Sequence, residues 1–218
     1  PPSQGADVIS ISFWRSDLAI SGVMSDCLDA ITRDGRNGKG VLVVIAAGNG
    51  ATDINRKTAW AAYEKTIVVA GSTESDERDP LSNFGKGIDL CAPTGLVTCC
   101  NIDSNTNNHF LAGHTGGSHD YDPSFGGTSA AAPLVAGVAA LVLSMDPTLT
   151  WEELRDVLRK TAVKINLANG DWKLDSDGKP EYSIYHGYGR IDAASAVRAV
   201  RRFSLFDPDR PRWFADWW

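Results

Sequence analysis

Short apolar runs alternate with longer segments of mixed polarity along this chain of 218 residues. Residues 41–47 are all apolar and mostly β-branched, which predicts a strand that is buried on both faces. Similar patterns predict strands at 8–12, 66–70, 88–91 and 96–100 and helices at 18–37, 130–145 and 150–161. Strands that alternate with helices in this way predict a three-layer α/β/α fold with a largely parallel sheet.

The sequence also marks helix boundaries. Asp146-Pro147 ends the preceding helix, because proline cannot continue the helical hydrogen-bond ladder. Thr150 precedes the next helix and Glu153 follows three residues later, which is the spacing of a capping box. By contrast, residues 101–125 are polar and lack periodicity, so they are expected to form a long surface loop.

Composition narrows the class of protein. A hydrophobic content of 43% is enough for the core of one domain, and no apolar run approaches the length of a membrane span. The net charge of −6 disfavours a nucleic-acid partner and suits a soluble protein whose cleft takes basic peptides. Residues 1–4 lack the basic and apolar parts of a signal peptide, so the start of the protein is expected elsewhere.

Four cysteines do not settle the redox compartment. Cys91 and Cys99 lie near predicted strands that could be neighbours, so a disulfide between them is one interpretation. Buried free thiols are the other. The vicinal pair Cys99-Cys100 fits no known metal-ligand spacing, and Cys27 stands apart.

The segment 126–133, Gly-Gly-Thr-Ser-Ala-Ala-Ala-Pro, carries the first candidate chemistry. It places Ser129 after a glycine turn and in the first turn of an apolar helix. The positive end of the helix dipole and free backbone N–H groups meet there, which suits a nucleophile whose reaction creates an oxyanion. The alternative is that Thr128 or Ser129 only caps the helix.

Asn49 carries the second candidate chemistry. It lies between two glycines just past the strand 41–47, at the end where open α/β sheets place their ligands. Its amide could donate to a developing negative charge, or the residue could only adopt a left-handed turn. A nucleotide-binding glycine turn is a further hypothesis, but Asp53 stands where the third glycine should be.

Together these two segments resemble the subtilisin-like serine proteases, or subtilases. The oxyanion motif resembles Ala47-Gly48-Asn49, and the nucleophile motif resembles 127–130 followed by Ala132-Pro133. Three further stretches are similar to family motifs: a cleft-wall strand at 5–12, a D-x-x-A-P strand at 89–93, and the closing turn and last helix at 187–194. The resemblance implies a subtilisin-like fold and an extracellular or periplasmic endopeptidase.

The resemblance also assigns roles to individual residues. It implies that Ser129 is the nucleophile and that Asn49 stabilises the oxyanion. The residues that it implies for substrate binding are Ser12, Phe13, Trp14, Asp17, Ala47, Gly48 and Thr128.

The family's other two catalytic residues are missing from this chain. In subtilases the triad runs Asp, His, Ser along the sequence, and both partners precede the strand matched at 8–12. The four histidines are His109, His114, His119 and His186, and none precedes Asn49. Without a base, turnover falls by about a million-fold in this family. We therefore expect a companion N-terminal segment that carries Asp and His, and an inactive chain without it.

Two alternatives stay open. The chain could be a subtilase-derived pseudoenzyme that acts as a binding or scaffold module. His114 or His119 could substitute as a local base, and His119-Asp120 with Asp122 could be a metal or substrate contact, although a solvated loop is the favoured interpretation.

Two acidic features bear on specificity and ions. The stretch 12–17 and the turn 35–40 resemble the kexin/furin branch, in which Asp17 would recognise a basic side chain before the scissile bond. Asp53 matches the branch only loosely, and Asn83 replaces an expected glutamate, so Asp17 could equally be a surface carboxylate. Asp171, Asp175 and Asp177 could bind Ca²⁺, but they lack the ligand pattern of an EF-hand and a solvated turn is favoured.

The end of the chain has an unusual composition. We divide the sequence into a catalytic-domain portion, 1–203, and an aromatic-rich tail, 204–218. Exposed aromatic side chains are unfavourable on a monomer, so the tail is expected to pack on the domain or on another chain.

Overall fold

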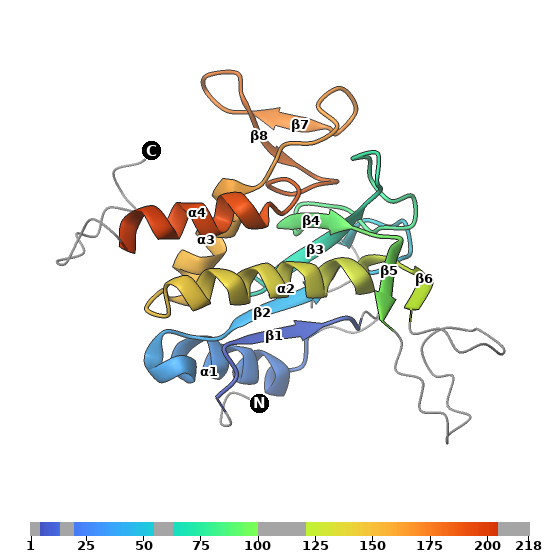
Figure 1. Ribbon diagram of the computed structural model, residues 1–218. Coiled ribbons are helices and arrows are strands. Elements are labelled where there is room, and N and C mark those ends of the chain that lie inside the picture. Colours follow the sequence, from blue (N-terminus) through green and yellow to red (C-terminus); the bar gives the residue numbers. More distant parts are fainter. Residues whose placement is uncertain (1–4, 14–19, 55–62, 100–120, 205–218) are drawn as a thin grey trace.

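A computed structural model describes residues 5–13, 20–54, 63–99 and 121–204. Four parallel strands form its central sheet in the order β1-β2-β3-β4 (Figure 1). They are β1 (Val8–Ile11), β2 (Leu42–Ala46), β3 (Ile67–Ser72) and β4 (Leu90–Pro93). Every residue of β2 and β3 is buried, as predicted from their continuous apolar runs.

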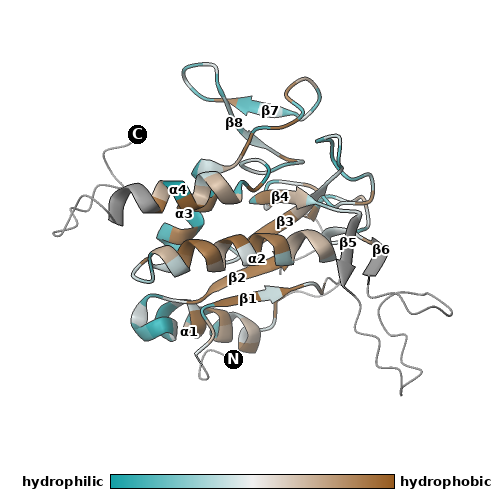
Figure 2. Ribbon diagram, in the orientation of Figure 1, coloured by the Kyte–Doolittle hydropathy of each residue, from teal (hydrophilic) through white to brown (hydrophobic). Residues whose placement is uncertain are grey.

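Helices cover both faces of this sheet. On one face, α1 (Gly22–Gly38) packs its Leu28 against alternate residues of β2. On the other face lie α2 (Thr128–Met145), α3 (Trp151–Thr161) and α4 (Ala193–Ser204), which share the largest apolar cluster with alternate residues of β2, β3 and β4 (Figure 2). The predicted three-layer α/β/α fold is therefore confirmed.

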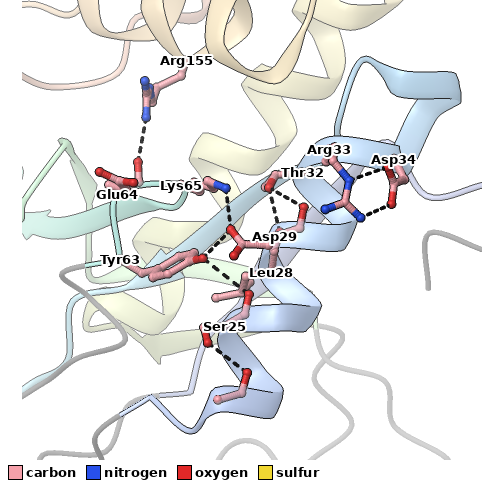
Figure 3. Close-up of polar contacts among 11 residues, drawn as sticks. Ser25, Leu28, Asp29, Thr32, Arg33, Asp34, Tyr63, Glu64, Lys65 and Arg155 are labelled. Atoms are coloured by element: carbon pink, nitrogen blue, oxygen red, sulfur yellow. Dashed lines mark hydrogen bonds and ion pairs between the residues drawn. The ribbon is translucent and has the colours of Figure 1, made fainter.

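Polar contacts fasten α1 to its neighbours. Asp29 accepts a hydrogen bond from the Tyr63 hydroxyl at 2.6 Å and pairs with Lys65, in the segment that leads into β3 (Figure 3). The hydrogen bond to Asp29 raises the pKa of Tyr63 to about 12. Arg155 of α3 donates to the carbonyl of Glu64 at 2.9 Å, so the same segment also contacts the other layer.

The turn after α1 depends on Arg36. Regular helical geometry stops before Gly35, and Arg36 and Asn37 adopt left-handed φ values of 53° and 57°. The Arg36 guanidinium is buried and donates to the carbonyls of Gly40, Pro147 and Leu149. It thereby ties the end of α1 to the connection between α2 and α3.

The helix boundaries agree with the sequence prediction. Helix α2 ends at Met145, and α3 begins after Thr150 with the complete capping box to Glu153. The sequence was expected to hold no apolar run near the length of a membrane span, and α2 contradicts this expectation. By length and composition, its 18 residues are long and apolar enough to span a membrane. Its packing against all four strands of the central sheet explains this composition, since a central core helix must be apolar on several sides.

Three other expectations require correction or completion. The stretch 101–125 is not loop throughout, because β6 (Tyr121–Phe125) pairs antiparallel with β5 (Leu96–Cys99). The acidic turn near Asp175 belongs to a hairpin of β7 (Trp172–Leu174) and β8 (Pro180–Ser183). Cys91 forms no disulfide but is a fully buried thiol, and burial raises its pKa.

His109, His114, His119 and the aromatic residues of the tail lie outside the described residues.

Candidate active site

Ser129 lies in the first turn of α2, where the backbone is shaped by a glycine and a proline. Gly127 precedes the helix with φ 71° and ψ −178°. Pro133, four residues after Ser129, has no N–H, so the Ser129 carbonyl lacks its usual helical donor. The Ser12 hydroxyl fills this role at 2.9 Å, and the Ser129 hydroxyl contacts the Ser12 carbonyl at 3.3 Å. The end of β1 is thereby joined to the start of α2.

Asn49 follows β2, and its side chain is held by Thr128. Its Oδ1 accepts hydrogen bonds from the backbone N–H and the hydroxyl of Thr128, both at 2.9 Å. The Gly48 N–H in turn donates to the Thr128 hydroxyl at 3.0 Å. Because a backbone N–H can only donate, the atom of Asn49 that faces Thr128 must be the oxygen. The Nδ2 group is left to donate elsewhere.

Gly127 leaves the space in which Asn49 lies. A Cβ atom at this position would be 2.8 Å from Asn49 Nδ2 and 3.0 Å from Asn49 Oδ1. Real Cβ contacts are not that short, so a larger residue would displace the carboxamide. Glycine at position 127 is thus required both by its left-handed backbone and by this close approach.

These residues open into one cavity of about 310 Å³. Its lining consists of Ser12, Phe13, Ala46, Gly48, Asn49, Thr128 and Ser129. Ser129 and Asn49 therefore border the same space, as an acyl-transfer site requires of its nucleophile and its oxyanion donor. Phe13 is 60% exposed at its edge, where an apolar substrate side chain could contact it.

The structure does not bring every predicted site residue to this cavity. Ala47 is fully buried and packs with Val68 and Ala70 in the core, while its neighbour Ala46 lines the cavity. Ala47 directly follows β2, and successive residues of an extended backbone point to opposite faces, so the side chains of Ala46 and Ala47 have different surroundings. Trp14 and Asp17 lie outside the described residues.

Among the described residues there is one histidine, His186, and its surroundings do not suit a catalytic base. His186 is fully buried, stacks on Trp172 and contacts the Ser183 hydroxyl through Nδ1 at 3.3 Å. Burial lowers its pKa to about 4, and it does not line the cavity of Ser129. No imidazole from the described ranges reaches the candidate nucleophile.

Sequence reasoning missed the role of Asn83, noting only that it replaces a glutamate. Its fully buried side chain hydrogen-bonds the turn that carries Asn49, including the N–H of Gly50 at 3.0 Å. The N–H groups of Gly48 and Gly50 are thus both engaged within the protein. They cannot cradle a phosphate, which argues against the nucleotide-binding hypothesis.

The acidic loop does not have the geometry of a cation site. One oxygen of Asp175 accepts the N–H groups of Asp177 and Lys179, as in a tight turn. Asp171 adopts a left-handed φ of 51°. Across the part of the chain that the structure describes, no group of three Asp, Glu, His or Cys side chains is placed to hold a metal ion.

Comparison with known proteins gives consistent matches. A family model described as the subtilase family matches residues 2–189. A calcium-dependent protease of Trichormus variabilis is 34% identical over 219 residues, covering 88% of this chain and 32% of that protein. Kexin of Saccharomyces cerevisiae is 33% identical over 166 residues, covering 75% of this chain and 19% of kexin. A solved protease of Pseudoalteromonas arctica matches with a TM-score of 0.65 and 28% identity, covering 89% of this chain and 51% of that one.

Proposed function

Because this chain belongs to the subtilase family, we propose that it contributes Ser129 and Asn49 to the active site of a serine endopeptidase. The observation that carries the proposal is the single cavity that Ser129 and Asn49 both line. The chain spans about a third of the Trichormus relative, so the activity belongs to a longer protein or an assembly.

In the proposed reaction, the Ser129 hydroxyl oxygen attacks the carbonyl carbon of a peptide bond, and its proton passes to a histidine of the companion segment. The resulting oxyanion accepts hydrogen bonds from Asn49 Nδ2 and from the Ser129 N–H, which belongs to the first turn of α2 and has no intrahelical partner. The C–N bond then breaks, the histidine protonates the leaving amine, and water hydrolyses the acyl-enzyme by the same route.

Two neighbouring surfaces support a companion segment. Within the described sheet β1 is an edge strand, and it is only partly buried although β2 beside it is fully buried. Helix α2, which packs against β1 and is apolar along most of its length (Figure 2), exposes Leu134, Leu141 and Met145. An apolar helix face beside an open strand edge is favourable only when another element covers it. We assign this surface to the segment that brings the catalytic Asp and His.

A fluorophosphonate probe, which reacts with activated serines, tests this function. Labelling is expected only when the N-terminal segment is co-expressed, and Ser129→Ala should abolish it. Ser144→Ala, which changes an exposed serine of the same helix, should label like the unchanged protein. Labelling of this chain alone would contradict the need for a companion, and no labelling in either case would favour the pseudoenzyme.

Substrate preference and calcium are further proposals. We propose that Asp17 selects a basic residue before the scissile bond. Equal cleavage of peptides with Arg and with Leu at that position would refute this proposal.

A Ca²⁺ requirement is proposed from the name of the Trichormus relative. The described acidic residues do not fit such an ion, so no site is assigned here, and loss of activity in EGTA would support the requirement. An extracellular location stays a prediction.

A further inference from the structure

Asn83 lies in the connection between β3 and β4, with no exposed surface. Its Nδ2 donates to the carbonyl of Ala47 at 2.8 Å. Its Oδ1 accepts the N–H groups of Gly50 and Thr52, each at 3.0 Å. Its backbone N–H also donates to the carbonyl of Gly48 at 2.9 Å. One residue thus makes four hydrogen bonds to the turn that presents Asn49.

This turn needs outside support. Gly48 has a φ of 94° and Ala51 has a left-handed φ of 47°, a conformation that alanine rarely adopts. Gly50 adds further freedom, so the turn would sample several arrangements if it were unsupported. Thr128 holds the Asn49 side chain, and Asn83 holds the backbone of the residues on either side of Asn49. The two contacts together determine where Asn49 Nδ2 points.

Asn83 is itself fixed to the sheet. Its carbonyl accepts the Ser82 hydroxyl at 3.0 Å, and that same hydroxyl accepts the Gly71 N–H of β3 at 2.9 Å. Arg78 donates to the Ser82 carbonyl at 2.6 Å. The backbone of Asn83 is therefore tied to β3 through the Ser82 hydroxyl.

We propose that Asn83 is a positioning residue for the oxyanion hole, acting through Asn49 rather than on the substrate. The inference rests on the proposed endopeptidase function. A carboxamide suits the position because one planar group must both donate to a carbonyl and accept from two N–H groups. A carboxylate would keep the two acceptor bonds but would place an oxygen against the Ala47 carbonyl.

A double-mutant cycle in the full-length protein tests this proposal. Asn49→Ala should lower kcat by about 10²- to 10³-fold, as expected for loss of an oxyanion donor. Asn83→Asp should lower kcat by about tenfold with little change in KM, because substrate contacts are untouched. In the Asn49→Ala background, Asn83→Asp should change kcat by less than about twofold, since the group it positions is gone.

Equal losses of kcat from Asn83→Asp in both backgrounds would overturn the proposal, and so would a change confined to KM. If the buried carboxylate of the Asn83→Asp variant prevents folding, the Asn83→Ser variant is used in the cycle instead. Ser183→Ala is the matched control, because it removes a buried hydroxyl with hydrogen bonds far from the cavity. It should lower the unfolding midpoint and leave kcat unchanged.

A second readout separates this inference from the proposed function. The side-chain amide signal of Asn49 in an NMR spectrum should broaden or shift in the Asn83 variants, whether or not the protein cleaves peptides. Unreactive wild-type protein with this spectral change would refute the endopeptidase and keep the positioning role. An unchanged Asn49 signal in the Asn83 variants would refute the positioning role.

Discussion

Replacing Gly127 with alanine should separate the geometry of the oxyanion donor from that of the nucleophile. Gly127 has φ 71° and ψ −178°, a combination that is almost restricted to glycine. The new methyl carbon would lie 2.8 Å from Asn49 Nδ2. Ser129 is two residues further along and keeps its contacts with Ser12. The carboxamide of Asn49 must therefore move, and its two hydrogen bonds from Thr128 are lost or weakened.

The expected magnitudes follow from these contacts. The backbone conformation costs an alanine about 1–3 kcal/mol. Two weakened hydrogen bonds add about 1 kcal/mol each, so the free energy of unfolding should fall by about 3–5 kcal/mol in total. Displacement of the donor should lower kcat by about 10²- to 10³-fold. KM should change little, because the displaced group acts on charge that develops during the reaction.

The assay is peptide hydrolysis by the full-length protein, with chemical denaturation of the same variants. Gly178→Ala is the matched control, because Gly178 also has a left-handed φ of 76° but its Cβ would meet no atom within 4 Å. It should cost about 1–2 kcal/mol of stability and leave kcat unchanged. A Gly127→Ala variant whose kcat stays within threefold of the wild type would refute the assigned role of Asn49.

Three further outcomes are expected. Ser12→Ala should cost about 0.5–1.5 kcal/mol of stability, because the exposed Ser129 carbonyl loses its hydroxyl donor. Pro133→Ala in the same variant should restore this stability by supplying the helical N–H, as urea denaturation would register. Arg36→Ala should lower the thermal midpoint sharply, whereas Arg33→Ala, at an exposed ion pair, should leave it unchanged; equal shifts would contradict this. Burial lowers the pKa of His186 to about 4, so between about pH 6.5 and pH 4 this imidazole is protonated only in the unfolded chain. The free energy of unfolding should therefore fall by about 3 kcal/mol as the pH falls through this range. A His186→Gln variant should lack this part of the pH dependence.

Much of the fold was predictable because the signals are local. The apolar run at 41–47 can only be a buried strand, and the capping box at Thr150 and Glu153 involves residues three apart. The α2 helix is likewise determined by its own apolar composition, although that composition alone does not distinguish a core helix from a membrane span. The stretch 121–125 was predicted as loop because its strand exists only through pairing with β5.

The candidate site divides in the same way. The residue types and their order were enough to select Ser129 and Asn49 as candidates, because a serine before an apolar helix and an asparagine after a buried strand are local patterns. Only the tertiary structure joined Ser129 to Ser12, 117 positions away, and Asn83 to Ala47, 36 positions away. It also placed the Ala47 side chain in the core instead of the cavity. Such contacts have no signature in either partner alone, because a hydrogen bond between distant residues depends on how the sheet brings their backbones together.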